Sequence, residues 1–267
     1  HLHIDMGANK ACYYKGFSGG GCGNSEAKQS TTTGDTDCLK RLDKLGVSYK
    51  KTAAKGVEDA VSLTGPLNGI VYSSGTGTTT TSQPMACEFV ETLWDLSDRL
   101  KDKGYKRVGT LGSYCYRCCC SWSETNDCRS ANDPTPVCSR GFSNHSWGRA
   151  LDIRYLEKND GTVYDINSNS DWVKYGSTDT CGKGLAAQSG TSLQLYTLAC
   201  SIKGLFSNLL TPNYNSAHRN HWHVDIGSTG SPSGATPKAL WSAGVDTGEH
   251  EDECGVGPDD SYFFPTP

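Results

Sequence analysis

The stretch HRNHWHVDI, residues 218–226, contains three of the seven histidines in the 267-residue chain. Side chains alternate between the two faces of a β-strand, so His221, His223 and Asp225 are predicted to share one face. The tryptophan and the valine between them point to the other face, where they can anchor the strand on a hydrophobic core. The stretch therefore predicts a strand that carries two imidazoles and a carboxylate on its polar side.

A second stretch, SNHSWGRALDI at 143–153, places His145 seven positions before Asp152, across a glycine-containing turn that leads into a strand. Together with His223, these residues would offer two imidazoles and one carboxylate, a set that suits Zn²⁺ and leaves a fourth position for water. Bound zinc lowers the pKa of water to about 7 and polarises a carbonyl group, as amide hydrolysis requires. The alternative is a structural, hydrogen-bonded His–Asp pair.

Length and composition favour a globular chain with its own core. With 35% hydrophobic and 20% charged residues, we expect one domain with extensions, and two small domains are the alternative. No apolar run approaches the roughly 18 residues of a transmembrane helix, so no membrane span is expected. The chain begins at His1 without a signal-like segment, so we expect any export signal to have been removed. The oligomeric state is left open.

Thirteen cysteines are far more than a reduced cytosolic protein normally carries. We therefore expect disulfides and a secreted protein, extracellular or periplasmic, in which the odd count leaves at least one cysteine without a partner in the chain. Six cysteines fall within one short region, and their spacing fits disulfides better than the alternative, a zinc knuckle. These are Cys115, Cys118, Cys119, Cys120, Cys128 and Cys138.

Charge is unevenly distributed along the chain. Residues 240–267 contain seven acidic side chains and no Lys or Arg, whereas all 25 basic side chains and 22 of the 29 acidic ones lie before them. The body thus carries a net charge of +3, which gives no case for nucleic-acid binding and is compatible with an anionic polymer as substrate.

Hydrophobic spacing predicts the main elements. Residues 1–37, rich in Gly, Ser and Thr, predict an irregular N-terminal extension, and 38–45 predict a short helix. An apolar stripe predicts a helix that starts near Pro84 and ends at Gly104. Strands are expected at 107–113 and 150–156.

A second long helix is expected from Ser192 until Pro212 stops it, and residues 227–267 are expected to form a linker and an acidic tail. The predicted fold class is α+β. We expect an antiparallel sheet that carries the zinc site, two long helices that flank this sheet, and disulfides that cross-link the domain.

The motifs resemble those of a known superfamily. Ser143, His145, Gly148, Ala150 and Asp152 reproduce the pattern S-x-H-x-x-G-x-A-x-D, and HWH supplies an H-x-H partner. Both patterns resemble the zinc D-Ala-D-Ala peptidases, which include D,D-carboxypeptidases, D,D-dipeptidases and penicillin-insensitive murein endopeptidases, with the hedgehog signalling domain as a relative.

Over residues 38–226 the chain resembles more closely the extensin-like C-terminal domain of secreted bacterial proteins. The similarity is carried by segments in that family's order. They are CLKRLDKLGVSYK (38–50), LGSYCYR (111–117), SNHSWGRALDI (143–153), DW (171–172), LACSIKGLF (198–206) and LTPNYNSAHRNHWHVD (210–225).

The resemblance implies roles for single residues. His145, Asp152 and His223 match the zinc ligands, and His221 and His218 match the extra histidines of the murein endopeptidases. Many carboxypeptidase relatives place a carboxylate general base where this chain has Asn220, which cannot accept a proton. His221, with an ordinary pKa of about 6.5, is the candidate base; the alternatives are a hydrogen bond to the oxyanion or support of the ligands.

Arg117 resembles the arginine of the family's S-G-Y-R element, whose guanidinium can grip a carboxylate; a surface arginine is the alternative. Asp225 either orients a ligand imidazole or forms a surface salt bridge. Ser143 and Gly148 are expected to shape the turn that aims His145.

The functional expectation is a secreted zinc peptidase that hydrolyses peptide bonds of peptidoglycan, as a D,D-carboxypeptidase or an endopeptidase. The alternative is a non-catalytic, zinc-stabilised module that binds the cell wall or a protein partner. A copper site at His1 and His3 is a third hypothesis, which no other motif in the sequence supports.

Overall fold

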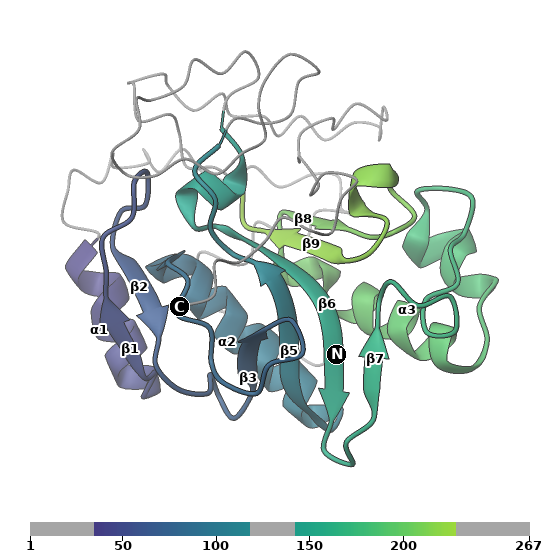
Figure 1. Ribbon diagram of the computed structural model, residues 1–267, viewed down its shortest axis with the longest axis horizontal. Helices are drawn as coiled ribbons and strands as arrows, with labels where there is room; N and C mark the ends of the chain where they lie inside the picture. The colour runs from purple at the N-terminus through teal and green to yellow at the C-terminus, as the bar shows by residue number, and fades with distance from the viewer. Residues whose placement is uncertain (1–34, 118–141, 228–267) are drawn as a thin grey trace, which may run out of the picture. The chain divides into compact units, whose positions relative to one another are not determined.

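The computed structural model describes residues 35–117 and 142–227, which form three α-helices and two β-sheets (Figure 1). The helices are α1 (Asp35–Leu45), α2 (Cys87–Asp102) and α3 (Gly190–Ile202). The smaller sheet is antiparallel, in the order β1 (Tyr49–Lys51), β2 (Ala60–Leu63), β4 (Met85–Ala86). The expected α+β class is confirmed.

The larger sheet has six strands and carries the candidate site. Its order is β3 (Val71–Ser74), β5 (Tyr105–Gly112), β6 (Ala150–Lys158), β9 (Trp222–Asp225), β8 (Asn208–Leu210), and β7 (Val163–Asp165) pairs with β6. The strands around the site pair in antiparallel fashion as predicted, but the sheet is mixed, because at one edge β3 pairs with β5 in parallel. The crossover that contains α2 returns the chain in the same direction, as parallel pairing requires.

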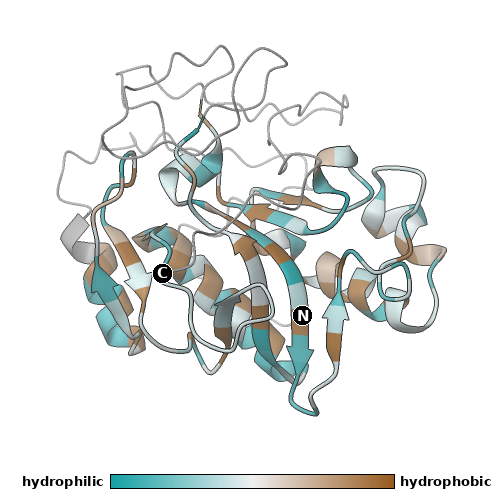
Figure 2. Ribbon diagram, in the orientation of Figure 1, coloured by the Kyte–Doolittle hydropathy of each residue, from teal (hydrophilic) through white to brown (hydrophobic). Residues whose placement is uncertain are grey.

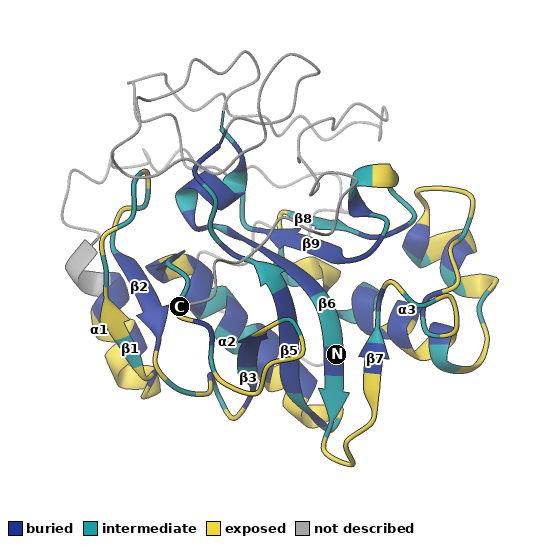
Figure 3. Cartoon of the chain, in the orientation of Figure 1, coloured by how far each residue is buried: buried dark blue, intermediate teal, exposed yellow. Residues whose placement is uncertain are grey.

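The core lies between this sheet and the long helices. Leu151, Ile153, Trp222 and Val224 point from β6 and β9 into a single hydrophobic cluster with residues of α2 and α3. Figure 2 shows hydrophobic segments along α2 and β5, and Figure 3 shows β9 fully buried. The alternation predicted for residues 221–225 is therefore confirmed, with the apolar side chains on the core face.

Two predicted helix boundaries are wrong, and in both cases strand pairing is the reason. α2 begins at Cys87 instead of near Pro84, because Met85 pairs with Val61 of β2. α3 ends at Ile202, and Leu209, which fits the helical spacing, pairs with Val224 as part of β8. A short apolar run fits both the helical and the strand period, so the element that it packs or pairs with decides whether a helix or a strand forms.

Two disulfides have both cysteines among the described residues. Cys38–Cys87 joins α1 to α2, and Cys181–Cys200 joins the π-helical turn Thr180–Gly184 to α3. Cys115 is also disulfide-bonded, as the disulfide interpretation of its cluster predicts.

Several predicted features lie outside the described residues. These are the other five cysteines of that cluster, nearly all of the predicted extension and tail, and the His1 and His3 pair. Within residues 35–117 and 142–227, every helix is too short or too polar to cross a membrane.

Candidate metal centre

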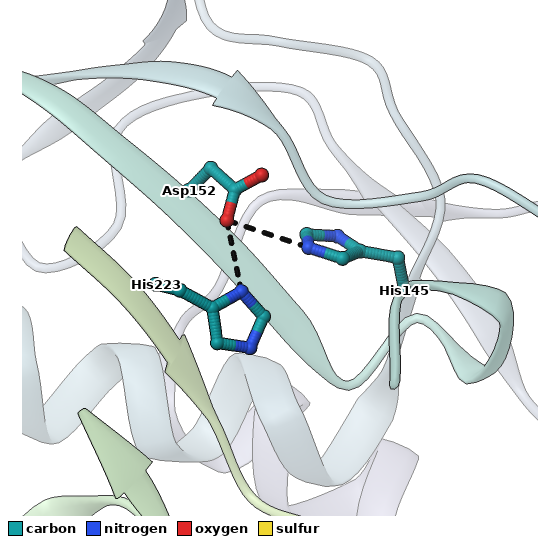
Figure 4. Close-up of side chains that lie close together, drawn as sticks. All are labelled: His145, Asp152 and His223. Carbon is teal, nitrogen blue, oxygen red and sulfur yellow. Dashed lines mark hydrogen bonds and ion pairs between the residues drawn. The ribbon is translucent and has the colours of Figure 1, made fainter. Parts of the chain in front are cut away.

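The pairing of β6 with β9 brings two distant segments together. Asp152 and His223 are direct partners in the antiparallel register, so their side chains lie next to each other on the same face. His223 Nδ1 lies 2.9 Å from Asp152 Oδ1. Figure 4 shows this carboxylate oxygen between the rings of His223 and His145.

His145 is aimed by a tight turn, the 3-10 helix Asn144–Trp147. The Ser143 hydroxyl accepts a hydrogen bond from the His145 N–H at 3.3 Å, and Gly148 ends the turn in the left-handed conformation at φ +60°. A Cβ atom at Gly148 would lie 2.8 Å from the backbone nitrogen of Ala86, so the turn needs glycine there. Both roles predicted for these residues are confirmed.

The predicted ligand set converges. Ligand atoms of His145, Asp152 and His223 all lie within 4.8 Å of one another, and His145 Nε2 is 3.4 Å from Asp152 Oδ1. The three residues are 3%, 5% and 1% exposed. His145 Nε2 is buried and has no close hydrogen-bond partner among the described residues, and this geometry is compatible with both a metal site and the alternative of a structural His–Asp pair. A buried N₂O donor set of this kind can hold a divalent cation.

The Asp152 carboxylate is kept ionised by its neighbours. Burial by itself would raise its pKa, but the charges of His145 and His221 outweigh burial and hold the pKa well below its ordinary value. His221 Nε2 lies 3.4 Å from the same oxygen, Oδ1. Three imidazoles therefore surround one anionic oxygen, which is ready to act as a metal ligand without losing a proton.

Asp225 contacts the nitrogen of the His223 ring that does not face Asp152. Its Oδ2 atom lies 3.1 Å from His223 Nε2, while Oδ1 accepts hydrogen bonds from the Asn208 side chain at 3.1 Å and the Gly227 N–H at 2.7 Å. The carboxylate is fully buried, so the surface salt bridge is wrong, and the contact with His223 that an orienting carboxylate needs is present. A carboxylate behind a ligand histidine fixes its tautomer and raises its basicity.

The two extra histidines border the cluster. The ring of His218 lies 5.3 Å from that of His221 and 5.7 Å from that of His223, measured between centroids. Burial and the nearby His223 and His221 lower the pKa of His218 to about 2, so its ring is neutral near pH 7. Asn220 Oδ1 lies 2.8 Å from His221 Nδ1, so Asn220 contacts the candidate base.

Arg117 lies beside the turn that carries His145. Its carbonyl oxygen accepts hydrogen bonds from the Ser143 N–H at 3.2 Å and the Ser146 hydroxyl at 2.8 Å, and its N–H donates to the Ser146 oxygen at 2.9 Å. The residue is only 5% exposed, so the surface-arginine alternative is wrong. Its predicted contact with substrate stays a prediction.

A family model described as the extensin-like protein C-terminus matches residues 36–233. The chain belongs to this family. No curated protein and no solved structure matches it. The resemblance to this family, expected over residues 38–226, is confirmed, and the match says nothing about activity.

Sequence reasoning missed two residues that support the centre of the extensin-like domain. Asn208 donates to Asp225, and the Asn215 side chain contacts the His218 ring at 2.7 Å. Asn215 could have been found, because Asn before a short polar turn is a capping signal. Asn208 could not, because its role depends on the pairing of β8 with β9.

Proposed function

We propose that this extensin-like domain is a secreted zinc-dependent peptidase that hydrolyses peptide bonds of peptidoglycan, as a D,D-carboxypeptidase or an endopeptidase. The convergence of His145, Asp152 and His223 carries the proposal. The resemblance of both motifs to the zinc D-Ala-D-Ala peptidases supports the substrate class. The two disulfides indicate an oxidising compartment outside the cytosol, which is where peptidoglycan is found.

The donor set fits zinc. His145 Nε2 is a buried nitrogen without a hydrogen-bond partner, Asp152 is ionised, and Asp225 orients the His223 ring. When bound, zinc supplies a Lewis acid and a water molecule of lowered pKa. The residues of the chain then have to bind the substrate, exclude bulk water and move protons.

Proton movement is assigned to His221. Its Nε2 atom faces the Asp152 oxygen, and Asn220 contacts its other ring nitrogen, so the ring presents Nε2 to the centre. His218 lies behind it as a second imidazole. Arg117, anchored through its backbone to the His145 turn, is proposed to pair with a substrate carboxylate.

The test measures zinc content and the release of D-alanine or peptides from purified sacculi. His145→Ala and Asp152→Asn should lose both, because each removes a ligand. Asp160→Asn is the matched control, since Asp160 is exposed in the turn between β6 and β7, and it should keep both. Unchanged release by His145→Ala protein that has lost its zinc would eliminate the proposal.

A non-catalytic, zinc-stabilised binding module is the second candidate. Two observations favour it: the amide of Asn220 at the position of the usual base, and the almost complete burial of the three ligands. Structural zinc mainly adds folding free energy. Such a module would release nothing from sacculi, and chelation would only lower its melting temperature, whereas a zinc peptidase would hydrolyse and would lose that activity on chelation.

A further inference from the structure

The His218 ring lies beside the candidate metal centre, with its centroid 5.3 Å from that of His221 and 5.7 Å from that of His223. The His218 Nε2 atom is fully buried and, among residues 35–117 and 142–227, has no hydrogen-bond partner, whereas Nδ1 lies 2.7 Å from Asn215 Oδ1. A neutral imidazole carries its proton on one nitrogen only, and the partner of the other nitrogen shows which. The Asn215 contact therefore decides what Nε2 can do.

The Asn215 side chain is oriented by backbone groups. Asn215 caps the 3-10 turn Ser216–His218, and its Oδ1 atom accepts hydrogen bonds from the Ala217 N–H at 3.0 Å and the His218 N–H at 3.1 Å. Backbone N–H groups only donate, so the atom that meets them is the amide oxygen and not the amide nitrogen. The same oxygen meets His218 Nδ1, which must then carry the proton.

The loop that presents Asn215 is anchored on both sides. Asn213 Oδ1 accepts hydrogen bonds from the Tyr175 N–H at 2.9 Å and the Tyr196 hydroxyl at 3.0 Å, which ties the loop to α3. The Tyr214 N–H donates to the Thr211 carbonyl at 2.8 Å. Asn215 thus stands on a fixed backbone, and its distance from the ring is set by the fold.

We propose that Asn215 is a positioning residue that holds His218 as the Nδ1–H tautomer, so that His218 Nε2 is an unprotonated acceptor next to the rings of His221 and His223. An unprotonated Nε2 can accept a hydrogen bond from an N–H or O–H group that enters the centre. With the proton on Nε2 it could only donate. This inference deepens the proposed function and rests on it only for the identity of the incoming group.

The tautomer can be measured directly. Long-range ¹H–¹⁵N correlation spectra of the ¹⁵N-labelled extensin-like protein, chelator-treated and zinc-loaded, show which nitrogen of each histidine ring carries the proton. We expect protonated Nδ1 and bare Nε2 at His218 in the wild type and in Asn215→Asp, whose carboxylate oxygen accepts the same three hydrogen bonds.

Asn215→Ser separates capping from positioning. Serine is a good cap but is one atom shorter, so the turn should stay intact while the contact with Nδ1 is lost. The melting temperature should stay near that of the wild type, the second tautomer of His218 should appear, and zinc-dependent release should fall about 10- to 100-fold. Asn215→Asp should restore the single tautomer.

Protonated Nε2 in the wild type, or an unchanged tautomer in a folded Asn215→Ser protein, would overturn the inference. Its outcome is separate from that of the proposed function. If no hydrolysis is found but the tautomer follows residue 215, the positioning role stands and the peptidase proposal fails.

Discussion

A substitution at Gly148 should affect both the stability of the domain and the orientation of the His145 side chain. At φ +60° an alanine costs roughly 1–2 kcal/mol through its left-handed backbone. Its Cβ would also meet the backbone of β4 at 2.8 Å from Ala86 N, and such overpacking costs about 1–3 kcal/mol. Gly148→Ala should therefore lower the free energy of unfolding by about 2–5 kcal/mol.

Gly46→Ala is the matched control. Gly46 has φ +72°, and no atom of the described residues lies within 4 Å of a Cβ built there. Gly46→Ala should therefore lower the free energy of unfolding only through the left-handed backbone, by about 1–2 kcal/mol. Urea unfolding of the chelator-treated proteins measures both losses. The Gly148 carbonyl also accepts a hydrogen bond from the Ala86 N–H, so relief of the contact should move the His145 turn and weaken zinc binding in Gly148→Ala alone. Equal losses in the two variants would refute the reasoning.

Three further predictions concern the same part of the chain. Asp225→Asn should weaken zinc binding about 10- to 100-fold in a competition titration, because His223 loses its carboxylate partner; unchanged affinity would contradict the orienting role. In chelator-treated protein, the depressed pKa of Asp152 stabilises the fold above the unfolded pKa of about 3.9, and this contribution is lost as the pH falls through the folded value. Urea titrations should show the stability difference between wild type and Asp152→Asn shrinking below about pH 4, and a constant difference would count against it. Removing the Cys38–Cys87 disulfide, which spans a sequence separation of 49, should cost about 4 kcal/mol in the same assay, and a loss near zero would contradict the loop-closure estimate.

The elements predicted with least error have long, regular patterns. The stripe of α2 and the strands near 107–113 and 150–156 were placed within a few residues of their observed bounds. The short strands β1, β2, β3, β4 and β7 were missed. Each has four residues or fewer, so its alternation is too short to distinguish from a loop, and only pairing with a neighbour stabilises it.

The candidate site was predictable to a different degree for each residue. His145, Asp152 and His223 stand in motifs whose residue types suit a metal, and the structure brings them together. The environment of Asp225 was left open between a buried and an exposed role, because a sequence does not state burial. The cap at Asn215 is predictable from an Asn before a short turn, but the contact of its side chain with the His218 ring is visible only in the structure.

The sequence by itself determined the chemistry that is available: the alternation in HWHVD, the glycine at the left-handed turn, and the types of the three candidate ligand residues. These are local properties, set by side-chain identity and backbone period. Only the tertiary structure decided that Asp152 pairs with His223, although 71 residues separate them. Strand register is chosen by burial of the apolar face of β6 and β9 on the core, a contact between distant segments, and a shift of one residue would turn the ligands away from each other.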